Sequence, residues 1–365
     1  PQIIGLSTYN ESWYAHIQLC RIIKKIDSNI KIFAGGAFAT FCYENILNES
    51  ETDYIVTGEG EYPTIDLCKA IVNKENISKI SGVIWKNSVG EIIKNKTNSR
   101  ITDLDKIPWP NRSLLDLSKY SMPYTISTAR GCPGQCIFCS SKSFWGHCVI
   151  LRSAENVFGE IMHLNKIYNA NLFYIADDTF TSSRKRALAI CNMIINSGKQ
   201  FTWACESRAD IVDDQLISTL KEAGCWKIQF GLESADDNIL KSLKKKVTVE
   251  QIENAIKIAH KYHMHITASF IVGHAYDTPE TIRRTIDFAK HVQKIYGVNV
   301  VGSINTPFPG TEQYQQSEKL GIEILTKDWN SYRRNNAIIN TKNLTANQLR
   351  SYYNEVLNLQ MKNKN

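Results

Sequence analysis

Short apolar runs alternate along the chain with longer stretches in which apolar residues recur every three or four positions. In the first part, the runs IIGLS (3–7), KIFAGG (31–36) and YIVTGEGE (54–61) predict buried strands. The periodic stretches around 13–26 and 63–73 predict helices that follow the first and third strands. Strands that alternate with helices in this way are typical of a doubly wound parallel sheet.

A second series of apolar runs begins near residue 124. Its predicted strands are YTISTA (124–129), LFYIA (172–176), FTWACE (201–206), KIQFG (227–231), ITASFIV (266–272) and VNVVGSI (298–304). Helical periodicity occupies most of the intervals between them. Six β/α units predict a barrel or a partial barrel, in which ligands bind at the carboxyl ends of the strands.

The region between the two series is irregular and includes a predicted hairpin, VIWKNSVGEII (83–93). The pattern predicts four parts. They are a partial doubly wound domain (1–75), a linker with a hairpin (76–123), a partial barrel (124–320) and a helical extension (321–365). Because the chain begins with Pro1 and enters a strand almost at once, we expect its true start to be missing and the first domain to be truncated.

The composition is that of a globular protein, with 43% hydrophobic and 22% charged residues and a formal charge of +7. No apolar run is long enough to predict a membrane span, and no signal segment opens the chain. Ten cysteines without a secretory signal predict a reducing cytoplasm and no disulfide framework. The densest basic spot predicts a solvated helix end more readily than a nucleic-acid patch, and comprises Lys241, Lys244, Lys245 and Lys246.

The clearest chemical motif is TARGCPGQCIFCSSKSFWG (128–146), which follows the first predicted barrel strand. It sets Cys132, Cys136 and Cys139 in a C-x3-C-x2-C array. Three thiolates on one short loop can each bind one iron of a cubane cluster and leave the fourth iron open to a ligand. Zinc is the alternative, and His147 or Cys148 could complete such a site.

This loop resembles the signature of the radical S-adenosylmethionine (SAM) superfamily. Further stretches resemble that superfamily's cobalamin-linked branch, with its class B methyltransferases: RSAENVFGEI (152–161), IADDTF (175–180), CESRAD (205–210), AGCWKIQFGLES (223–234) and TPFPGTE (306–312). At the front, IIGLS, GGAFAT (35–40) and DYIVTGEGE (53–61) resemble the later half of a cobalamin-binding domain. The resemblance implies an α/β fold, a partial (β/α)6 radical SAM barrel preceded by a truncated doubly wound cobalamin-binding-like domain.

The resemblance also implies cofactors and their ligands. It assigns Cys132, Cys136 and Cys139 to a [4Fe–4S] cluster whose fourth iron binds SAM, and reduction then releases a 5′-deoxyadenosyl radical. The residues implied to contact SAM are Phe138, Asp177, Asp178, Arg208, Glu233 and Gly273. Those implied to contact cobalamin are Ser7, Thr8, Gly35, Gly36, Gly58, Glu59 and Gly60.

Several of these residues also have a structural interpretation. Asp178 or Thr179 could cap a helix, and Arg208 could pair with Glu206 or Asp210. Asp277 follows Gly273 at a position where relatives usually have glutamate. Four residues near strand ends could line a substrate cavity or simply pack, namely Trp145, Trp203, Tyr276 and His274.

The function implied is a cobalamin-dependent methyltransferase that acts on an unactivated carbon or on phosphorus. The alternatives are a non-methylating radical enzyme that cyclises, rearranges or couples carbons, a methylthiotransferase, and an iron–sulfur protein without turnover. A methylthiotransferase needs a second cluster, and Cys20 and Cys68 lie in predicted helices where they would not converge with Cys42. We expect a small-molecule, natural-product or lipid substrate and an electron donor such as flavodoxin or ferredoxin. The sequence names neither the substrate nor a catalytic side chain.

Overall fold

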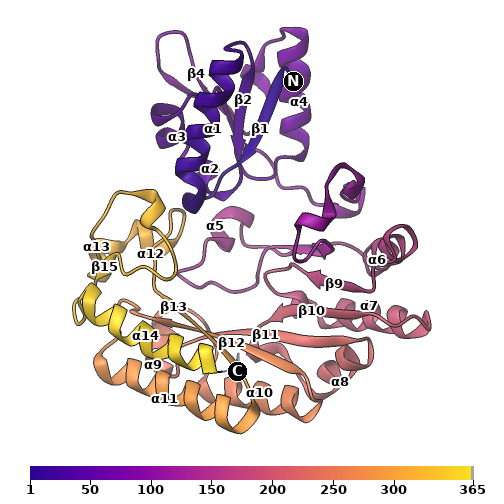
Figure 1. The fold of residues 1–365 in the computed structure, drawn as a ribbon, viewed down its shortest axis with the longest axis vertical. Helices are drawn as coiled ribbons and strands as arrows, with labels where there is room; N and C mark the ends of the chain where they lie inside the picture. Colours follow the sequence, from indigo (N-terminus) through magenta and orange to yellow (C-terminus); the bar gives the residue numbers. More distant parts are fainter. Residues whose placement is uncertain (363–365) are drawn as a thin grey trace.

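The computed structural model describes residues 1–362 and contains two sheets, one above the other in Figure 1. The upper sheet has the order β1-β2-β3-β4-β5, with β1 (Ile3–Ser7), β2 (Lys31–Gly35), β3 (Tyr54–Val56), β4 (Val83–Lys86) and β5 (Ile92–Lys94). Its first three strands are parallel, as predicted. The helices around it are α1 (Trp13–Ile26), α2 (Ala37–Phe41), α3 (Tyr43–Glu49) and α4 (Glu61–Asn73).

The predicted hairpin forms, but it belongs to the upper sheet. Strand β4 pairs antiparallel with β3, and β5 pairs antiparallel with β4. The buried side chains Val83 and Ile84 join the apolar clusters under this sheet. The first α/β unit therefore extends beyond residue 75, the last residue that we had assigned to it. The backbone groups at the edge of β3 need hydrogen-bond partners, and β4 supplies them.

The lower sheet has six parallel strands in the order β13-β12-β11-β10-β9-β6. They are β6 (Thr125–Ile126), β9 (Leu172–Ile175), β10 (Thr202–Ser207), β11 (Cys225–Glu233), β12 (His265–Val272) and β13 (Asn299–Ile304). The long helices between them are α6 (Ala154–Tyr168), α7 (Arg184–Asn196), α8 (Asp214–Glu222), α10 (Val249–Lys261) and α11 (Pro279–Tyr296). Strands adjacent in sequence are adjacent in the sheet, which confirms the predicted partial (β/α)6 barrel.

Shorter elements connect these units. They are β7 (Ala129–Arg130), α5 (Ser141–Trp145), β8 (Ile150–Leu151), α9 (Asp237–Ser242), α12 (Glu312–Gln315) and α13 (Ser317–Leu320). Helix α5 lies between the barrel sheet and the upper domain (Figure 1).

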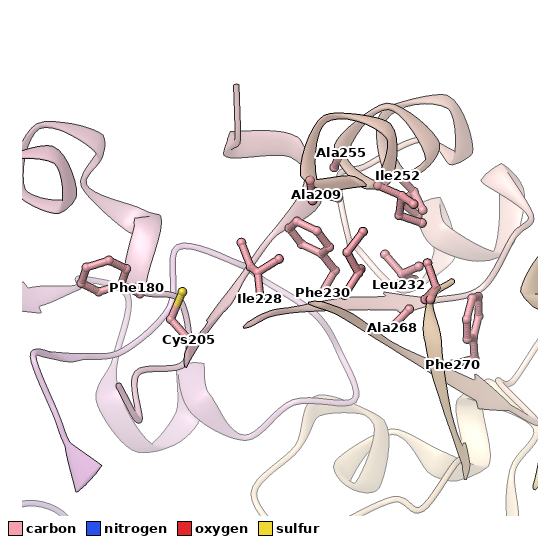
Figure 2. Close-up of a cluster of buried hydrophobic side chains, with 14 of the residues drawn as sticks. Phe180, Cys205, Ala209, Ile228, Phe230, Leu232, Ile252, Ala255, Ala268 and Phe270 are labelled. Carbon is pink, nitrogen blue, oxygen red and sulfur yellow. The ribbon is translucent and has the colours of Figure 1, made fainter. Parts of the chain in front are cut away.

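The two faces of the barrel sheet have different characters. Figure 2 shows Ile228, Phe230 and Leu232 of β11 directed toward Ile252 and Ala255 of helix α10. These side chains are buried and form the outer core between sheet and helices. Because side chains alternate along a strand, the intervening residues point to the inner face. That face is turned toward α5 and the upper domain (Figure 1).

The C-terminal part is less helical than we expected. Residues 321–345 contain the antiparallel pair β14 (Glu323–Ile324) and β15 (Ile339–Asn340), and only α14 (Ala346–Lys362) is a long helix. Helix α14 packs on the edge strand β13, where a Cβ on Gly302 would lie 2.6 Å from Val356 Cγ1. Glycine thus permits the close approach that covers this edge. Residues 363–365 of the expected extension lie outside the described residues.

A buried ion network fastens the linker to the barrel. The Glu160 carboxylate of α6 is 1% exposed and lies 3.0 Å from Arg112 Nη1 and 2.6 Å from Arg152 Nη1. Arg112 belongs to the linker, and its Nη2 also donates to the Thr125 carbonyl at 2.6 Å. One carboxylate therefore compensates two buried guanidinium groups and fixes the chain just before the first barrel strand.

We predict that Glu160→Gln destabilises the protein by about 3–5 kcal/mol, because it leaves buried guanidinium charge without its counter-ion. The measurement is the thermal unfolding midpoint, followed by circular dichroism. Asp287→Asn, which removes an exposed carboxylate on α11, is the control and should change the stability by less than about 0.5 kcal/mol. Equal midpoints for the two variants would contradict this role of Glu160.

Candidate functional site

The three cysteines lie on one loop between β7 and α5. The backbone N–H of Gly134 donates to Cys132 Sγ at 3.3 Å, and Thr179 Oγ1 lies 3.3 Å from the same sulfur. A Cβ on Gly134 would lie 3.3 Å from Cys132 Sγ and 3.7 Å from Cys136 Sγ. The loop therefore curls around its own sulfur atoms, and a side chain at Gly134 would intrude between them.

Burial and the nearby positive charges act on the Cys136 thiol in opposite directions. Burial raises the pKa of the Cys136 thiol, and Lys245 and Arg208 act in the opposite direction by stabilising its anion. Arg208 Nη1 lies 3.1 Å from the position that a Cβ on Gly134 would take. The thiolate is the form that binds a metal, and Lys245 and Arg208 are the two groups that stabilise it here.

A cubane cluster and a single zinc ion need different arrangements of their ligands. Within residues 1–362, no three His, Cys, Asp or Glu side chains converge on a point where a single metal ion could bind. His147 and Cys148, the possible zinc ligands, are exposed, and the Cys148 carbonyl accepts a hydrogen bond from Arg100 at 2.6 Å. A cubane distributes its three cysteine ligands over three irons, so it does not require that convergence.

The two aspartates after β9 have different environments. Asp177 is buried, and its Oδ1 accepts hydrogen bonds from the backbone N–H groups of Thr128 at 2.6 Å and Ala129 at 3.0 Å. Its Oδ2 accepts from the Thr128 hydroxyl, and burial raises the pKa of this carboxyl. Asp178 is exposed and accepts from Ser141 Oγ at 2.5 Å. Asp177 thus anchors the segment before the cysteines, and Asp178 is the member of the pair that solvent reaches.

Arg208 and Glu233 lie at the ends of β10 and β11. Arg208 pairs with Asp210, with Nε 2.9 Å from Oδ1 and Nη2 2.8 Å from Oδ2. Of the two structural partners that we considered, the structure therefore selects Asp210. The Glu233 carboxylate is buried, and its Oε1 lies 2.9 Å from Lys245 Nζ. A Cβ on Gly231 would lie 2.5 Å from that oxygen, so glycine makes room for the pair.

Lys245 lies beside Glu233 in the candidate site, and the sequence analysis missed it. We expected it in a solvated basic cluster, and that expectation is wrong because Lys245 is only 7% exposed. Its neighbours Lys244 and Lys246 are exposed and have φ values of +56° and +55°. This turn directs the middle lysine inward, and no periodicity in a run of three lysines could have revealed which one is buried.

The turn after β12 is fixed by one carboxylate. Asp277 Oδ2 accepts from the backbone N–H groups of Gly273 at 3.0 Å and His274 at 2.8 Å, and its Oδ1 accepts from Thr281 Oγ1 at 2.7 Å. The Gly273 carbonyl accepts from Asn305 Nδ2 at 3.0 Å. Both backbone polar groups of Gly273 are therefore already paired within the protein.

The aromatic residues that we singled out divide into packing and surface groups. Trp203 is fully buried in the outer core, which supports the packing interpretation, and Tyr276 is exposed. The ring of Phe138 lies 5.8 Å from that of His274, centroid to centroid. Burial lowers the pKa of His274 to about 4, so its imidazole is neutral near pH 7. Trp145 is partly buried and packs against two arginines.

The expected cobalamin residues lie at the carboxyl edge of the upper sheet, which faces the barrel (Figure 1). Gly36 and Gly58 have φ values of +97° and +66°, and a Cβ on Gly58 would meet no atom within 4 Å. Together with Gly35 and Gly60 they leave this edge without bulky side chains, which fits the close approach of a large ligand.

Thr8 and Glu59, two other expected cobalamin residues, form hydrogen bonds within the protein. The Thr8 hydroxyl is buried and lies 2.9 Å from His16 Nδ1. The Glu59 carboxylate is buried, and its Oε2 accepts from the backbone N–H of Ile101 at 2.7 Å. Ser7 ends β1 and is exposed. Of these three side chains, only Ser7 is therefore open to a ligand.

Glu59 also connects the two domains. Its Oε1 lies 2.6 Å from Arg130 Nη1, and Arg130 Nη2 pairs with Glu61. Arg130 precedes Cys132 by two residues, so these ion pairs fix the cysteine loop to the upper sheet. The sequence did not reveal this connection, because the partners lie about 70 positions apart and neither belongs to a periodic pattern.

Comparisons with known proteins agree with this architecture. A family model described as the radical SAM superfamily matches residues 126–289, and a B12 binding domain model matches residues 1–67. The uncharacterized methyltransferase PH0819 of Pyrococcus horikoshii is 31% identical over 354 residues, which are 96% of this chain and 76% of that protein. The chain belongs to the radical SAM superfamily. Membership implies a [4Fe–4S] cluster and SAM, and the B12 binding domain supports cobalamin, as the resemblance suggested.

Two further comparisons define how far the similarity extends. The anaerobic magnesium-protoporphyrin IX monomethyl ester cyclase of Rubrivivax gelatinosus is 28% identical over 345 residues, 91% of this chain and 60% of that protein. The structure of the cobalamin-dependent S-adenosylmethionine radical enzyme OxsB with aqua-cobalamin bound superposes with a TM-score of 0.79 at 18% identity. The superposition covers 99% of this chain and 58% of OxsB, and shows a shared fold.

In residues 1–362, no helix is long and apolar enough to cross a membrane.

We predict that Cys136→Ala loses most of the iron and the visible absorbance of the reconstituted protein, because a cubane cannot persist with two of its three thiolates. Cys148→Ala is the matched control, since this exposed thiol lies outside the loop. Iron and zinc are measured after anaerobic reconstitution. A requirement for Cys148, or zinc in place of iron, would contradict the cubane assignment.

We predict that Asp277 makes the stability fall as the pH rises from about 4 to about 6. Burial raises the pKa of its carboxyl to about 6, so the folded state keeps a proton that the unfolded chain releases. Deprotonation then opposes folding by up to about 3 kcal/mol. The measurement is urea unfolding of the wild type and Asp277→Asn across this range. A pH-independent difference between the two proteins would refute the assignment.

Proposed function

We propose that this chain is a cobalamin-dependent methyltransferase of the radical SAM superfamily that acts on an unactivated carbon or on phosphorus. The observation that carries the proposal is the position of the cysteine loop. The loop lies between the glycine-rich carboxyl edge of the upper sheet and the inner face of the barrel. The Glu59–Arg130 ion pair connects the loop to the upper sheet. When bound, the cofactors would supply radical generation and a carried methyl group.

The chain's own residues would bind and orient these cofactors. Cys132, Cys136 and Cys139 would ligate the cluster. Three more side chains would bind SAM: Asp178 would receive the ammonium, Arg208 the carboxylate and Glu233 the ribose hydroxyls. This part of the proposal is supported by the exposure of Asp178 and by the position of Arg208 Nη1 beside the cysteine loop. The remaining SAM contacts proposed, Phe138 and Gly273, would be apolar, since the backbone groups of Gly273 are already paired.

We further propose a cytoplasmic setting and an electron donor such as flavodoxin or ferredoxin. All ten cysteines are free thiols, which suits a reducing compartment. The donor would reduce the cluster, and the substrate would be a small molecule, with no role for nucleic acid.

A non-methylating radical enzyme is the second candidate, because the cyclase of R. gelatinosus matches 91% of this chain. A methylthiotransferase finds less support. Cys20 is buried beside His16 and Thr52, whereas Cys42 belongs to a separate apolar cluster, so these two thiols do not share a site for a second cluster.

The two candidates differ in what they do with SAM before any substrate is known. A cobalamin-dependent methyltransferase should form 5′-deoxyadenosine and also S-adenosylhomocysteine, the latter only when cobalamin is bound. The test is anaerobic incubation of the reconstituted protein with SAM and dithionite, with and without cobalamin, and with Cys136→Ala and Cys148→Ala beside it. Deoxyadenosine without cobalamin-dependent S-adenosylhomocysteine would favour the non-methylating enzyme. The absence of both products would refute the proposal.

A further inference from the structure

A row of polar side chains crosses the inner face of the barrel sheet. Strand register places Glu206 of β10 beside Gln229 of β11, Gln229 beside Thr267 of β12, and Thr267 beside Asn299 of β13. The neighbours of these residues along each strand, such as Ile228 and Phe230, point into the outer core (Figure 2). The row therefore faces the interior of the barrel, on the side where α5 and the upper domain lie.

Glu206 is the charged member of this row, and one of its oxygens is open. Its Oε1 accepts hydrogen bonds from the Tyr174 hydroxyl at 2.7 Å and from Gln229 Nε2 at 3.2 Å. Across the described residues, Oε2 has no hydrogen-bond partner, and no Lys or Arg nitrogen lies within 4 Å of the carboxylate. The side chain is only partly buried, so a ligand in the barrel can reach it.

The charges around Glu206 favour a cation. Burial raises the pKa of Glu206, as do the negative charges of Asp178 and Glu233, whereas the Tyr174 hydrogen bond and the positive charge of Arg334 lower it. Lys245 already pairs with Glu233, and Arg334 is exposed. A partly desolvated carboxylate beside other carboxylates is stabilised by a positive ligand.

The position of Glu206 suits a substrate better than a structural role. Arg208 follows it by two residues on the same face, which separates the two Cα atoms by about 7 Å. A group bound at Glu206 would thus lie below the residues proposed to contact SAM. A hydrocarbon ligand would call for an apolar floor, and this row offers a carboxylate, two amides and a hydroxyl.

We propose that Glu206, supported by Tyr174 and Gln229, binds a cationic nitrogen of the substrate, such as a protonated amine or an amidine. The inference rests on the proposed function in one respect, which is that the bound molecule is the acceptor of the radical reaction. The ammonium of SAM has the same chemistry, so the test must separate substrate from cofactor.

The test uses two small probes that differ in charge, benzylamine and benzyl alcohol. Their binding to the reconstituted holoprotein is measured by equilibrium dialysis, with S-adenosylhomocysteine present to fill the cofactor site. We expect benzylamine to bind at least about tenfold more tightly than benzyl alcohol, since a charge-assisted hydrogen bond replaces a neutral one. Glu206→Gln should abolish this preference by weakening benzylamine alone.

Four controls make the result specific. Glu206→Asp retains the charge and should retain the preference, and Asp287→Asn, which removes an exposed carboxylate, should have no effect. Iron content and circular dichroism verify that each variant is folded and loaded. Glu206→Gln should also bind SAM with wild-type affinity and give the wild-type change in the electron paramagnetic resonance spectrum of the reduced cluster when SAM is added.

Three outcomes would overturn the inference. Equal binding of both probes, or binding of neither, would exclude a cation site at Glu206. A loss of SAM affinity in Glu206→Gln would assign the carboxylate to the cofactor. Probe binding requires no turnover, so a failure of S-adenosylhomocysteine formation with an intact charge preference would count against the methyltransferase proposal alone.

Discussion

The cysteine loop depends on the hydrogen bonds that Asp177 accepts. Strand β6, which leads to the loop, pairs with β9 over only two residues, so the sheet itself does little to fix the position of the loop. Asp177 accepts from two successive backbone N–H groups and a hydroxyl at Thr128 and Ala129. A buried carboxylate without these donors would be strongly unfavourable, and the donors would be unsatisfied without it. This mutual dependence fixes the chain a few residues before Cys132.

A second set of charges fixes the loop from the other side. Arg130 pairs with Glu59 and Glu61 of the upper domain, and Glu59 is largely removed from water. Ion pairs of this kind add geometric definition because each partner carries hydrogen-bonding directions as well as charge. The loop is thus positioned between two sheets by side chains that do not themselves ligate a metal. Such supporting groups orient the ligands of a site.

Buried charge compensation recurs elsewhere in the molecule. Glu160 compensates Arg112 and Arg152, and Glu233 compensates Lys245. Glu206 differs from these carboxylates, since it has neutral donors and no cation at ion-pair distance among residues 1–362. The other carboxylates stabilise the fold. On the inner face of the barrel, Glu206 has one oxygen, Oε2, without a hydrogen-bond partner among the described residues.

Much of the architecture was readable from local patterns. Hydrophobic periodicity located the six barrel strands and α1, because burial on one side of an element leaves a repeat in the sequence. The cysteine spacing indicated the cluster, since three ligands on one short loop need no knowledge of the fold. The pattern did not assign the hairpin to the upper sheet or reveal the short pair β14–β15, because sheet membership depends on a partner distant in sequence.

The sequence by itself determined the α/β class, the order of the barrel strands and the three thiols. Only the tertiary structure decided the roles of the charged residues. Asp177 and Asp178 are adjacent and chemically identical, yet Asp177 is buried and accepts backbone hydrogen bonds, whereas Asp178 is exposed. Lys245 is buried among three exposed lysines. Local patterns record which face of an element is apolar, whereas the environment of a charge is set by partners that only folding brings close.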